Sequence, residues 1–168
     1  MIPDFFMDTI FYNTILSPVG FLELKTNNDF LFSVSFTENL LPASDFQPPV
    51  LKETARQINA YFEGKLKRFD LQIQPEGTDF QLKVWEQVMK VEFGKTVSYL
   101  EIALQTGSKN NTRAVGLANG KNPIPIIIPC HRIIGVNGKL TGYAGGIEKK
   151  RWLLQHEQNL SGKTHLLF

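Results

Sequence analysis

The sequence NPIPIIIPCHRII, residues 122–134, decides how this chain is interpreted, because it contains the only cysteine among 168 residues. Prolines at 123, 125 and 129 lack a backbone donor and fix φ, so the stretch forms neither a regular helix nor a central strand. We therefore expect a rigid, irregular segment that presents Cys130, followed at once by His131 and Arg132. Reactive groups are common on such irregular backbone.

Two interpretations of Cys130 stay open on this pattern alone. A lone cysteine in an apolar run is usually a small buried hydrophobe, and aliphatic neighbours raise its pKa and keep it inert. A base beside the thiol would instead make it a nucleophile, and His131 is the nearest candidate in the sequence. His131 has its own alternative, as a histidine of the core or one that faces a phosphate.

The composition excludes several classes of protein. Hydrophobic residues make up 42% of the chain and charged residues 20%, which is typical of a globular protein. One cysteine excludes an internal disulfide and a thiolate-rich zinc site, and favours a reducing compartment. No apolar run approaches the roughly 20 residues of a membrane span, and residues 1–6 lack the basic region of a secretory signal. We expect a cytoplasmic protein with no metal and no membrane partner.

Charge is distributed unevenly along the chain. Residues 1–108 contain nine Lys and Arg against fourteen Asp and Glu, whereas residues 109–168 contain nine against two. A positive segment around the cysteine indicates a polyanionic partner, of which nucleic acid is the main candidate. Scattered lysines on a solvated face are the alternative, and charge alone does not decide between them.

The N-terminal half predicts a small mixed domain that supports the rest. Residues 21–36 are typical of a β-hairpin, with a turn at residues 27–29 and an alternating apolar face of Phe30, Phe32, Val34 and Phe36. A helix follows, with helical spacing of Leu51, Ala55, Ile58 and Phe62. Residues 69–73 alternate as a short strand. Residues 75–77 break the pattern, so we place the boundary there and expect domains of residues 1–76 and 77–168.

The C-terminal half predicts short helices with defined starts. Thr78 with Gln81, and Ser98 with Glu101, each form the S/T-x-x-E/Q pattern of a capping box. The first should open a helix that ends at residues 93–94. The second should open a short helix with Leu100, Ala103 and Leu104 inside, followed by a glycine turn and a slim helix over residues 112–119.

Two short helices joined in this way indicate a helix-turn-helix. The second contains Ala114 and Gly116, and small residues let a helix backbone approach a groove closely; packing of helices within the domain is the alternative. Residues 135–146 then contain five glycines, a loop that another backbone or a flat ligand can approach. A last helix is expected over residues 147–157. The whole chain is thus expected to be α/β, of the α+β type.

Taken together, these segments resemble the family of 6-O-alkylguanine-DNA alkyltransferases, also called methylated-DNA–protein-cysteine methyltransferases. The similarity runs from about residue 80 to residue 157. It is carried by VSY at 97–99, RAVG at 113–116, NP at 122–123, IPCHR at 128–132, GYAGG at 142–146 and WLL-x-HE at 152–157. The resemblance implies a small N-terminal domain of ribonuclease-H-like topology and a mostly helical catalytic domain whose helix-turn-helix uses the minor groove.

The resemblance also implies a reaction. Cys130 would take the alkyl group from 6-O-alkylguanine, and from 4-O-alkylthymine, in double-stranded DNA, in one irreversible turnover by a monomer without a cofactor. His131 would act as the base, through a water, with Glu157 orienting the imidazole. Tyr99 would hydrogen-bond the leaving base, and Asn122 would form the hinge between the slim helix and the active site.

Further residues are assigned by the same resemblance. Arg113 would fill the place of the flipped nucleotide, with Tyr99, Ala114, Gly116 and Arg132 also on the DNA. The substrate pocket would be walled by Tyr143, Ala144, Gly145 and Ile133. Some relatives have serine where Ala144 stands, so here backbone amides must bind oxygen-6. A damage sensor that only binds, and a Cys-His-Glu hydrolase, are the competing hypotheses; the retained cysteine argues against the first.

Overall fold

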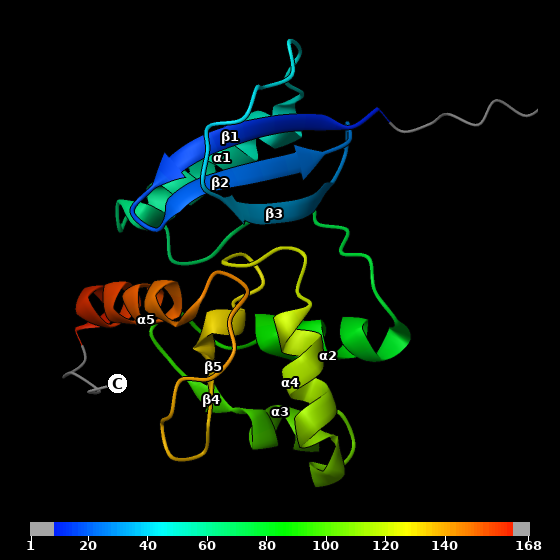
Figure 1. The fold of residues 1–168 in the computed structure, drawn as a ribbon, viewed down its shortest axis with the longest axis vertical. Helices are drawn as coiled ribbons and strands as arrows, with labels where there is room; N and C mark the ends of the chain where they lie inside the picture. Colours follow the sequence, from blue (N-terminus) through cyan, green and yellow to red (C-terminus); the bar gives the residue numbers. More distant parts are fainter. Residues whose placement is uncertain (1–8, 163–168) are drawn as a thin grey trace, which may run out of the picture. The chain divides into compact units, whose positions relative to one another are not determined.

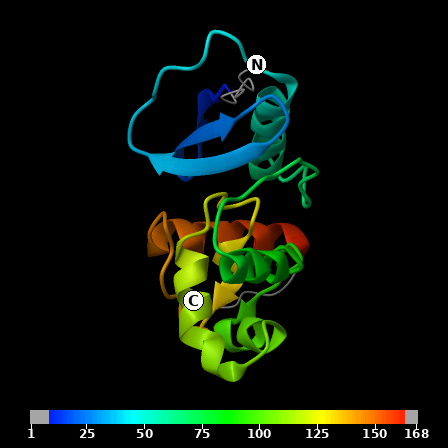
Figure 2. The same cartoon turned by 90° about the vertical axis from the view of Figure 1, so that its right-hand side faces the viewer.

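The computed structural model describes residues 9–162 and divides the chain into two compact units, Met1–Gln74 and Pro75–Phe168 (Figures 1 and 2). The N-terminal residues 1–6 lie outside the described residues. The predicted domains of residues 1–76 and 77–168 stay a prediction, because a compact unit is a domain only if it folds by itself.

The N-terminal unit is a three-stranded antiparallel sheet with one helix on it. The strands β1 (Phe11–Ser17), β2 (Gly20–Thr26) and β3 (Leu31–Thr37) pair in the order β1-β2-β3. One face of the sheet is covered by α1 (Pro49–Phe62) in both views (Figures 1 and 2). The predicted hairpin is confirmed as β2 and β3. The sequence did not indicate β1, because its buried positions are Thr14 and Ser17 and show no apolar alternation.

Two details of the predicted N-terminal core were wrong. Along β3 the buried residues are Leu31 and Val34, because the register between β2 and β3 shifts at Lys25/Thr26. The aromatic side chains expected inside are therefore only half-buried. On α1, Leu51 and Ile58 are buried as predicted, but Thr54, Gln57 and Tyr61 accompany them in place of the predicted Ala55 and Phe62. The short strand expected over residues 69–73 is reduced to one bridge, between Leu31 and Ile73.

The C-terminal unit is mainly helical. Its elements are α2 (Asp79–Met89), β4 (Val97–Ser98), α3 (Tyr99–Gln105), η1 (Lys109–Asn111), α4 (Thr112–Gly120), η2 (Cys130–Arg132), β5 (Ile133–Ile134) and α5 (Ile147–Ser161). The pair β4 and β5 is parallel, with Val97 opposite Ile133 (Figure 1). Both predicted capping boxes are present, at Thr78 and at Ser98. Together with the N-terminal sheet, these elements confirm the α+β class.

The helix-turn-helix is present as α3, η1 and α4, with one error in its predicted interior. Ile102 and Ala103 are buried, whereas Leu104 is 58% exposed, so the buried face of α3 is rotated from the predicted one. Trp85 on α2 fixes the second helix, since its indole Nε1 donates to the Ala118 carbonyl at 2.9 Å. Helix α2 ends four residues earlier than predicted, at Met89, and α5 continues four residues further, to Ser161.

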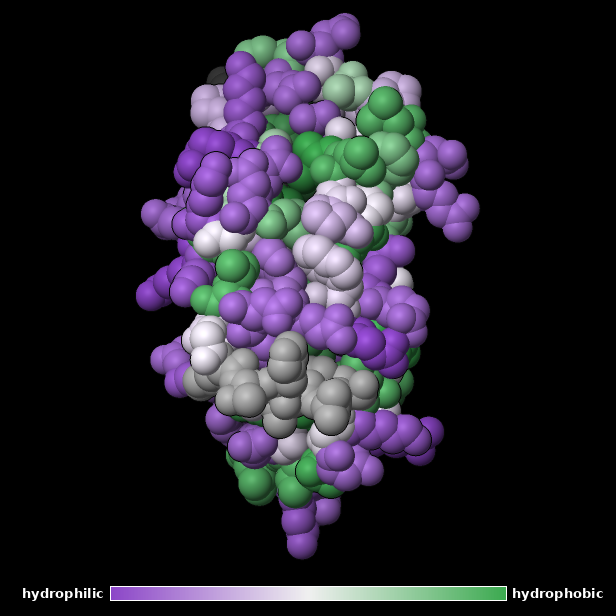
Figure 3. Space-filling view, turned by 90° about the vertical axis from the view of Figure 1, so that its left-hand side faces the viewer, coloured by the Kyte–Doolittle hydropathy of each residue, from purple (hydrophilic) through white to green (hydrophobic). Residues whose placement is uncertain are grey.

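On the side drawn in Figure 3, most of the visible surface is hydrophilic; hydrophobic residues form one connected group in the upper part of the view and smaller groups elsewhere. Singly exposed apolar residues are normal on a water-facing surface. Among the described residues, no helix has both the length and the apolar character needed to cross a bilayer.

Candidate functional site

The turn that leads to the cysteine is held by one side chain, Asn122. Its Nδ2 donates to the Ile128 carbonyl at 2.8 Å, and its Oδ1 accepts from the Ile124 amide at 2.9 Å. Between these contacts, Ile126 has φ of 76°, a left-handed conformation that is strained for a β-branched residue. The side chains of Ile124, Ile126 and Ile128 are completely buried. Their packing and the Asn122 hydrogen bonds together hold the turn in place.

Cys130 begins the 3-10 turn η2 and is buried, with 1% of its surface exposed. The side-chain Nδ2 of Asn119, on α4, donates to the Cys130 carbonyl at 3.2 Å, which connects the turn with the helix-turn-helix. Burial raises the pKa of the Cys130 thiol to about 11, although a hydrogen bond from Asn122 and the positive charge of Lys150 both act to lower it. The resting thiol is therefore protonated at neutral pH.

A buried chain of charged groups starts at the next residue. His131 Nε2 lies 2.7 Å from Glu157 Oε1. Arg132 donates to the same carboxylate twice, from Nε to Oε2 at 3.0 Å and from Nη2 to Oε1 at 2.9 Å. Its Nη1 donates to the Val91 carbonyl at 2.6 Å. The Gly94 amide completes the set at 3.0 Å from Glu157 Oε2. Glu157 thus has a cation and several donors around it, which a buried carboxylate needs.

The protonation of this chain follows from its surroundings. Burial raises the pKa of Glu157, but the contacts with His131 and Arg132 lower it by more, so the carboxyl is ionised. Burial lowers the pKa of His131, and Glu157 only partly opposes this, so the imidazole is neutral at pH 7. Because Nε2 faces a carboxylate, Nε2 carries the proton and Nδ1 is an acceptor. Nδ1 is buried without a hydrogen-bond partner among the described residues.

Tyr99 and Lys150 form the second polar group of the unit. The Tyr99 hydroxyl donates to the Thr141 carbonyl at 3.2 Å. Lys150 Nζ donates to the Ile133 carbonyl at 2.5 Å, to the Thr141 carbonyl at 2.9 Å and to the Tyr99 hydroxyl at 3.4 Å. Burial raises the pKa of Tyr99, against the lowering effect of its hydrogen bonds with Thr141 and Asn119. The pKa of Lys150 is lowered by burial to about 8.

The residues predicted to contact DNA fall into two groups. Arg113 is exposed on α4, while Ala114 and Gly116 are half-buried on the same helix. Gly116 faces Tyr99, since a Cβ built there would lie 4.0 Å from the ring. Arg132 differs from these, because it is 6% exposed and its guanidinium is bound to Glu157 and Val91. A direct contact of Arg132 with DNA does not fit this position.

The predicted pocket residues lie in the segments that follow the cysteine. Ile133 is buried in β5, and the Tyr143 ring stands edge-on to His131 with centroids 6.5 Å apart. Ala144 is exposed and Gly145 half-buried in the glycine-rich loop. Sequence reasoning missed Lys150 and Asn119, because each lies on a helix while its hydrogen-bond partners come from other segments, which no local pattern shows. No group of His, Cys, Asp and Glu within residues 9–162 is arranged to hold a metal.

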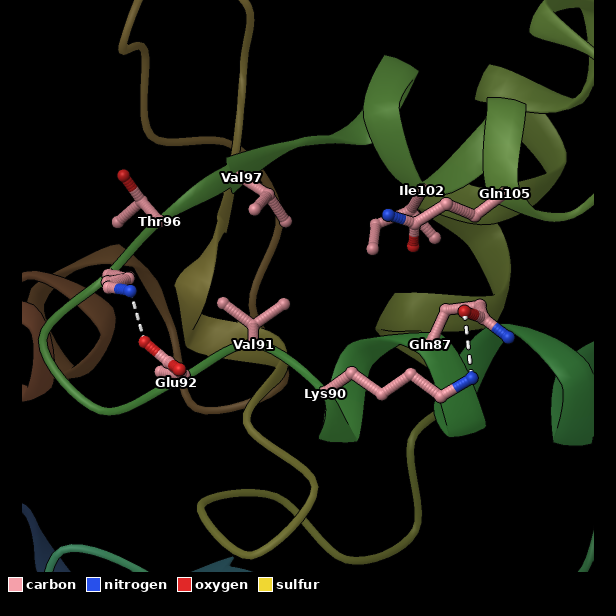
Figure 4. Close-up of a pocket in the computed structure, with 9 residues that line it drawn as sticks. Gln87, Lys90, Val91, Glu92, Thr96, Val97, Ile102 and Gln105 are labelled. Carbon is pink, nitrogen blue, oxygen red and sulfur yellow. Dashed lines mark hydrogen bonds and ion pairs between the residues drawn. The ribbon is translucent and has the colours of Figure 1, made fainter.

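A separate pocket of about 290 Å³ lies on the C-terminal unit (Figure 4). It is lined by Gln87, Lys90, Val91, Glu92, Lys95, Thr96, Val97, Ile102 and Gln105. None of these is a predicted site residue. Two of its lining residues contact the segment that contains the cysteine, since the Val91 carbonyl accepts from Arg132 and Val97 pairs with Ile133.

Fold and site define a helix-turn-helix protein with a buried cysteine, histidine and glutamate in one unit. Two family models match it: the 6-O-methylguanine DNA methyltransferase ribonuclease-like domain over residues 10–75, and the DNA binding domain of the same methyltransferase over residues 79–159. The chain belongs to this family and is an enzyme of the methylated-DNA–protein-cysteine methyltransferase class. The resemblance found in the sequence is thereby confirmed, including its ribonuclease-like N-terminal part.

Individual relatives cover nearly all of the chain. A methylated-DNA–protein-cysteine methyltransferase of Methanosarcina barkeri is 46% identical over 89% of this chain and 98% of its own length. One of Mycobacterium tuberculosis is 45% identical over 95% of this chain and 99% of its own length. The crystal structure of Mycobacterium tuberculosis OGT in complex with DNA is similar, with a TM-score of 0.81 and 46% identity over 89% of this chain and 93% of the other.

Proposed function

We propose that this enzyme repairs double-stranded DNA by moving the alkyl group of 6-O-alkylguanine to Cys130 in one irreversible turnover. 4-O-alkylthymine is proposed as a second substrate, because it presents the same alkyl ether on a flipped base. The observation that carries the assignment to Cys130 is the contact of His131 Nε2 with Glu157 at 2.7 Å. That contact leaves Nδ1 as an acceptor on the residue next to the thiol, the nucleophile–base–orienter arrangement.

The proposed step moves one alkyl group and one proton. The thiol proton passes to His131, directly or through a water, and the thiolate attacks the alkyl carbon. The S–C bond forms as the C–O bond breaks, and the electron pair stays on guanine oxygen-6. Tyr99 donates its proton to the ring of the leaving base, and the imidazolium returns its proton to Tyr99. The product thioether has no route back to a thiol here, which makes the reaction stoichiometric.

The burial of Cys130 supports a two-condition mechanism. A thiol with a pKa of about 11 is not a nucleophile until a proton acceptor and a substrate are both in place. The target atom lies inside a duplex, so the nucleotide must be flipped out before it reaches this turn. The proposed pocket walls are Ile133, Tyr143, Ala144 and Gly145, and Asn122 holds the turn between pocket and helix-turn-helix.

DNA binding is assigned to α4 and its surroundings. Arg113 is proposed to occupy the place of the flipped nucleotide, and the small residues Ala114 and Gly116 to let the helix approach the minor groove. Readout in that groove is poor in sequence information, which suits an enzyme that must act at any damaged guanine. We further propose that the protein acts as a monomer in the cytoplasm, where its lone cysteine stays reduced; sedimentation of the protein with and without DNA tests the first point.

The intact mass of the protein tests the proposal. After mixing with duplex DNA that contains labelled 6-O-methylguanine, each molecule should gain one labelled methyl group, and peptide mapping should place it on Cys130. Cys130→Ser serves as the matched control and should gain none. Damage-dependent binding without a mass gain would instead indicate a binding-only sensor, and repeated turnover of an ester substrate would indicate a hydrolase.

A further inference from the structure

Lys150 is a charged group that the steps above do not use. It lies on the first turns of α5 and is completely buried, and no carboxylate pairs with it among residues 9–162. Burying an ammonium without a counter-ion is costly unless its donors are all satisfied. A buried lysine of this kind is commonly functional, because an apolar side chain would fill the same space at lower cost.

The three contacts of the ammonium join three separate segments of the site. The Ile133 carbonyl belongs to β5, directly after the turn that contains Cys130. The Thr141 carbonyl belongs to the glycine-rich loop, two residues before Tyr143. The Tyr99 hydroxyl is at the start of α3. One side chain thus connects the cysteine turn, the predicted pocket wall and the predicted proton donor.

The charge is also placed where negative charge would form. Lys150 Nζ is 5.6 Å from the centre of the Tyr99 ring and 3.4 Å from its hydroxyl oxygen. Its positive charge lowers the pKa of Cys130 and of His131. The titratable groups around it are therefore Tyr99 on α3 and Cys130 and His131 on η2. A fixed cation that faces both a developing thiolate and a developing phenolate stabilises each of them.

We propose that Lys150 is a positioning residue for alkyl transfer: its ammonium fixes Tyr99 and the Ile133 and Thr141 carbonyls together, and supplies the positive charge against which the Cys130 thiolate and the Tyr99 phenolate form. This inference rests on the proposed function. Lys150 itself gains and loses no proton during the step; the thiol proton still goes to His131 and the base still receives the proton of Tyr99.

A set of Lys150 variants tests the role at constant fold. Lys150→Met removes the charge and the three hydrogen bonds at similar length, and should slow single-turnover transfer about 100-fold without weakening binding to undamaged duplex. Lys150→Arg keeps the charge and should recover part of the rate. Lys149→Met, the adjacent lysine on α5, is the matched control and should transfer at the normal rate.

The pH profile separates this role from simple structural support. Because the pKa of Lys150 is lowered to about 8, the wild-type rate should fall short, above that pH, of the rise that continued thiolate formation would give, and this shortfall is the alkaline loss. In Lys150→Met the alkaline loss should be absent, and in Lys150→Arg the rate should keep rising, since arginine stays charged. Circular dichroism and thermal melting establish that each variant is folded; if Lys150→Met is not, the Lys150→Arg profile decides alone.

Two results would overturn the inference. One is transfer by folded Lys150→Met at the wild-type rate. The other is an alkaline loss that persists unchanged in Lys150→Arg. Failure of the proposed function itself looks different, because the wild-type protein would then gain no mass on Cys130 in the first place.

Discussion

The two units of this protein bury polar groups in different ways. Among the described residues of the N-terminal unit the buried polar residues are neutral, namely Thr14, Ser17, Thr26, Thr54 and Gln57, and an ion pair such as that of Arg56 with Glu53 lies on exposed side chains. In the C-terminal unit the buried set includes His131, Arg132, Lys150 and Glu157. A core held only by packing does not need buried charge, so the difference locates the chemistry in the C-terminal unit.

Of the variants considered, Glu157→Gln should have the largest effect on stability, because Glu157 is the buried carboxylate of the C-terminal unit. Glu157→Gln leaves Arg132 buried without its counter-charge and should lower the free energy of unfolding by about 3 kcal/mol. It should also slow methyl transfer, because His131 loses the carboxylate that fixes its tautomer. Denaturant unfolding and single-turnover rates measure the two effects. Glu53→Gln, in the exposed pair of the N-terminal unit, should change stability far less; equal losses in both variants would contradict the distinction.

The contribution of Glu157 to the free energy of unfolding should depend on pH. The pKa of Glu157 is lower in the folded protein than its ordinary value of 4.5, so the folded state binds fewer protons than the unfolded one. Its contribution to stability is therefore complete above pH 4.5 and is lost as the pH falls through the folded value. The stability difference between wild type and Glu157→Gln should shrink progressively below pH 4.5. A difference that stays constant with pH would mean that Glu157 does not titrate in this way.

Asn122 is an uncharged buried side chain of the C-terminal unit, and its removal should also affect both stability and the rate of transfer. Asn122→Ala leaves the Ile124 amide buried without a partner and the Ile128 carbonyl with the Cys130 amide alone, which should cost about 1–3 kcal/mol. Transfer should slow as well, because Cys130 lies two residues beyond the released carbonyl. Asn59→Ala, an exposed position on α1, is the control and should leave stability unchanged. Loss of stability without any change in rate would show that the turn need not be fixed for attack.

Several of these contacts could be predicted from the sequence and others could not. The capping boxes at Thr78 and Ser98 are local and were predicted correctly, as was the helix-turn-helix. Strand β1 was missed because its inward side chains are polar, and Leu104 was placed inside because α3 is too short for periodicity to fix its phase. The ion pair of Arg132 with Glu157 joins residues 25 positions apart in the sequence, a contact that no local pattern encodes. Lys150 was missed for the same reason.

Arg113 should give the smallest effect on the fold and a selective effect on function. Arg113→Ala removes an exposed charge, so its melting temperature should match that of the wild type. Transfer from duplex DNA should fall about tenfold, the cost of one strong contact to nucleic acid, while transfer from a free alkylguanine base should not change. Lys52→Ala, an exposed lysine on α1, is the control. Equal losses on both substrates would contradict a role of Arg113 in the duplex.

The raised pKa of Cys130 has a consequence for the life of each molecule. With a pKa of about 11, only about one molecule in 10⁴ holds a thiolate at pH 7. The thiolate is the form of cysteine that reacts with peroxides, disulfides and electrophilic metabolites, so a protonated sulfur of this kind reacts with them only slowly. A protein that can react only once is thereby kept unmodified until it binds an alkylated base. Its selectivity for that base over other electrophiles begins with the low reactivity of the protonated thiol.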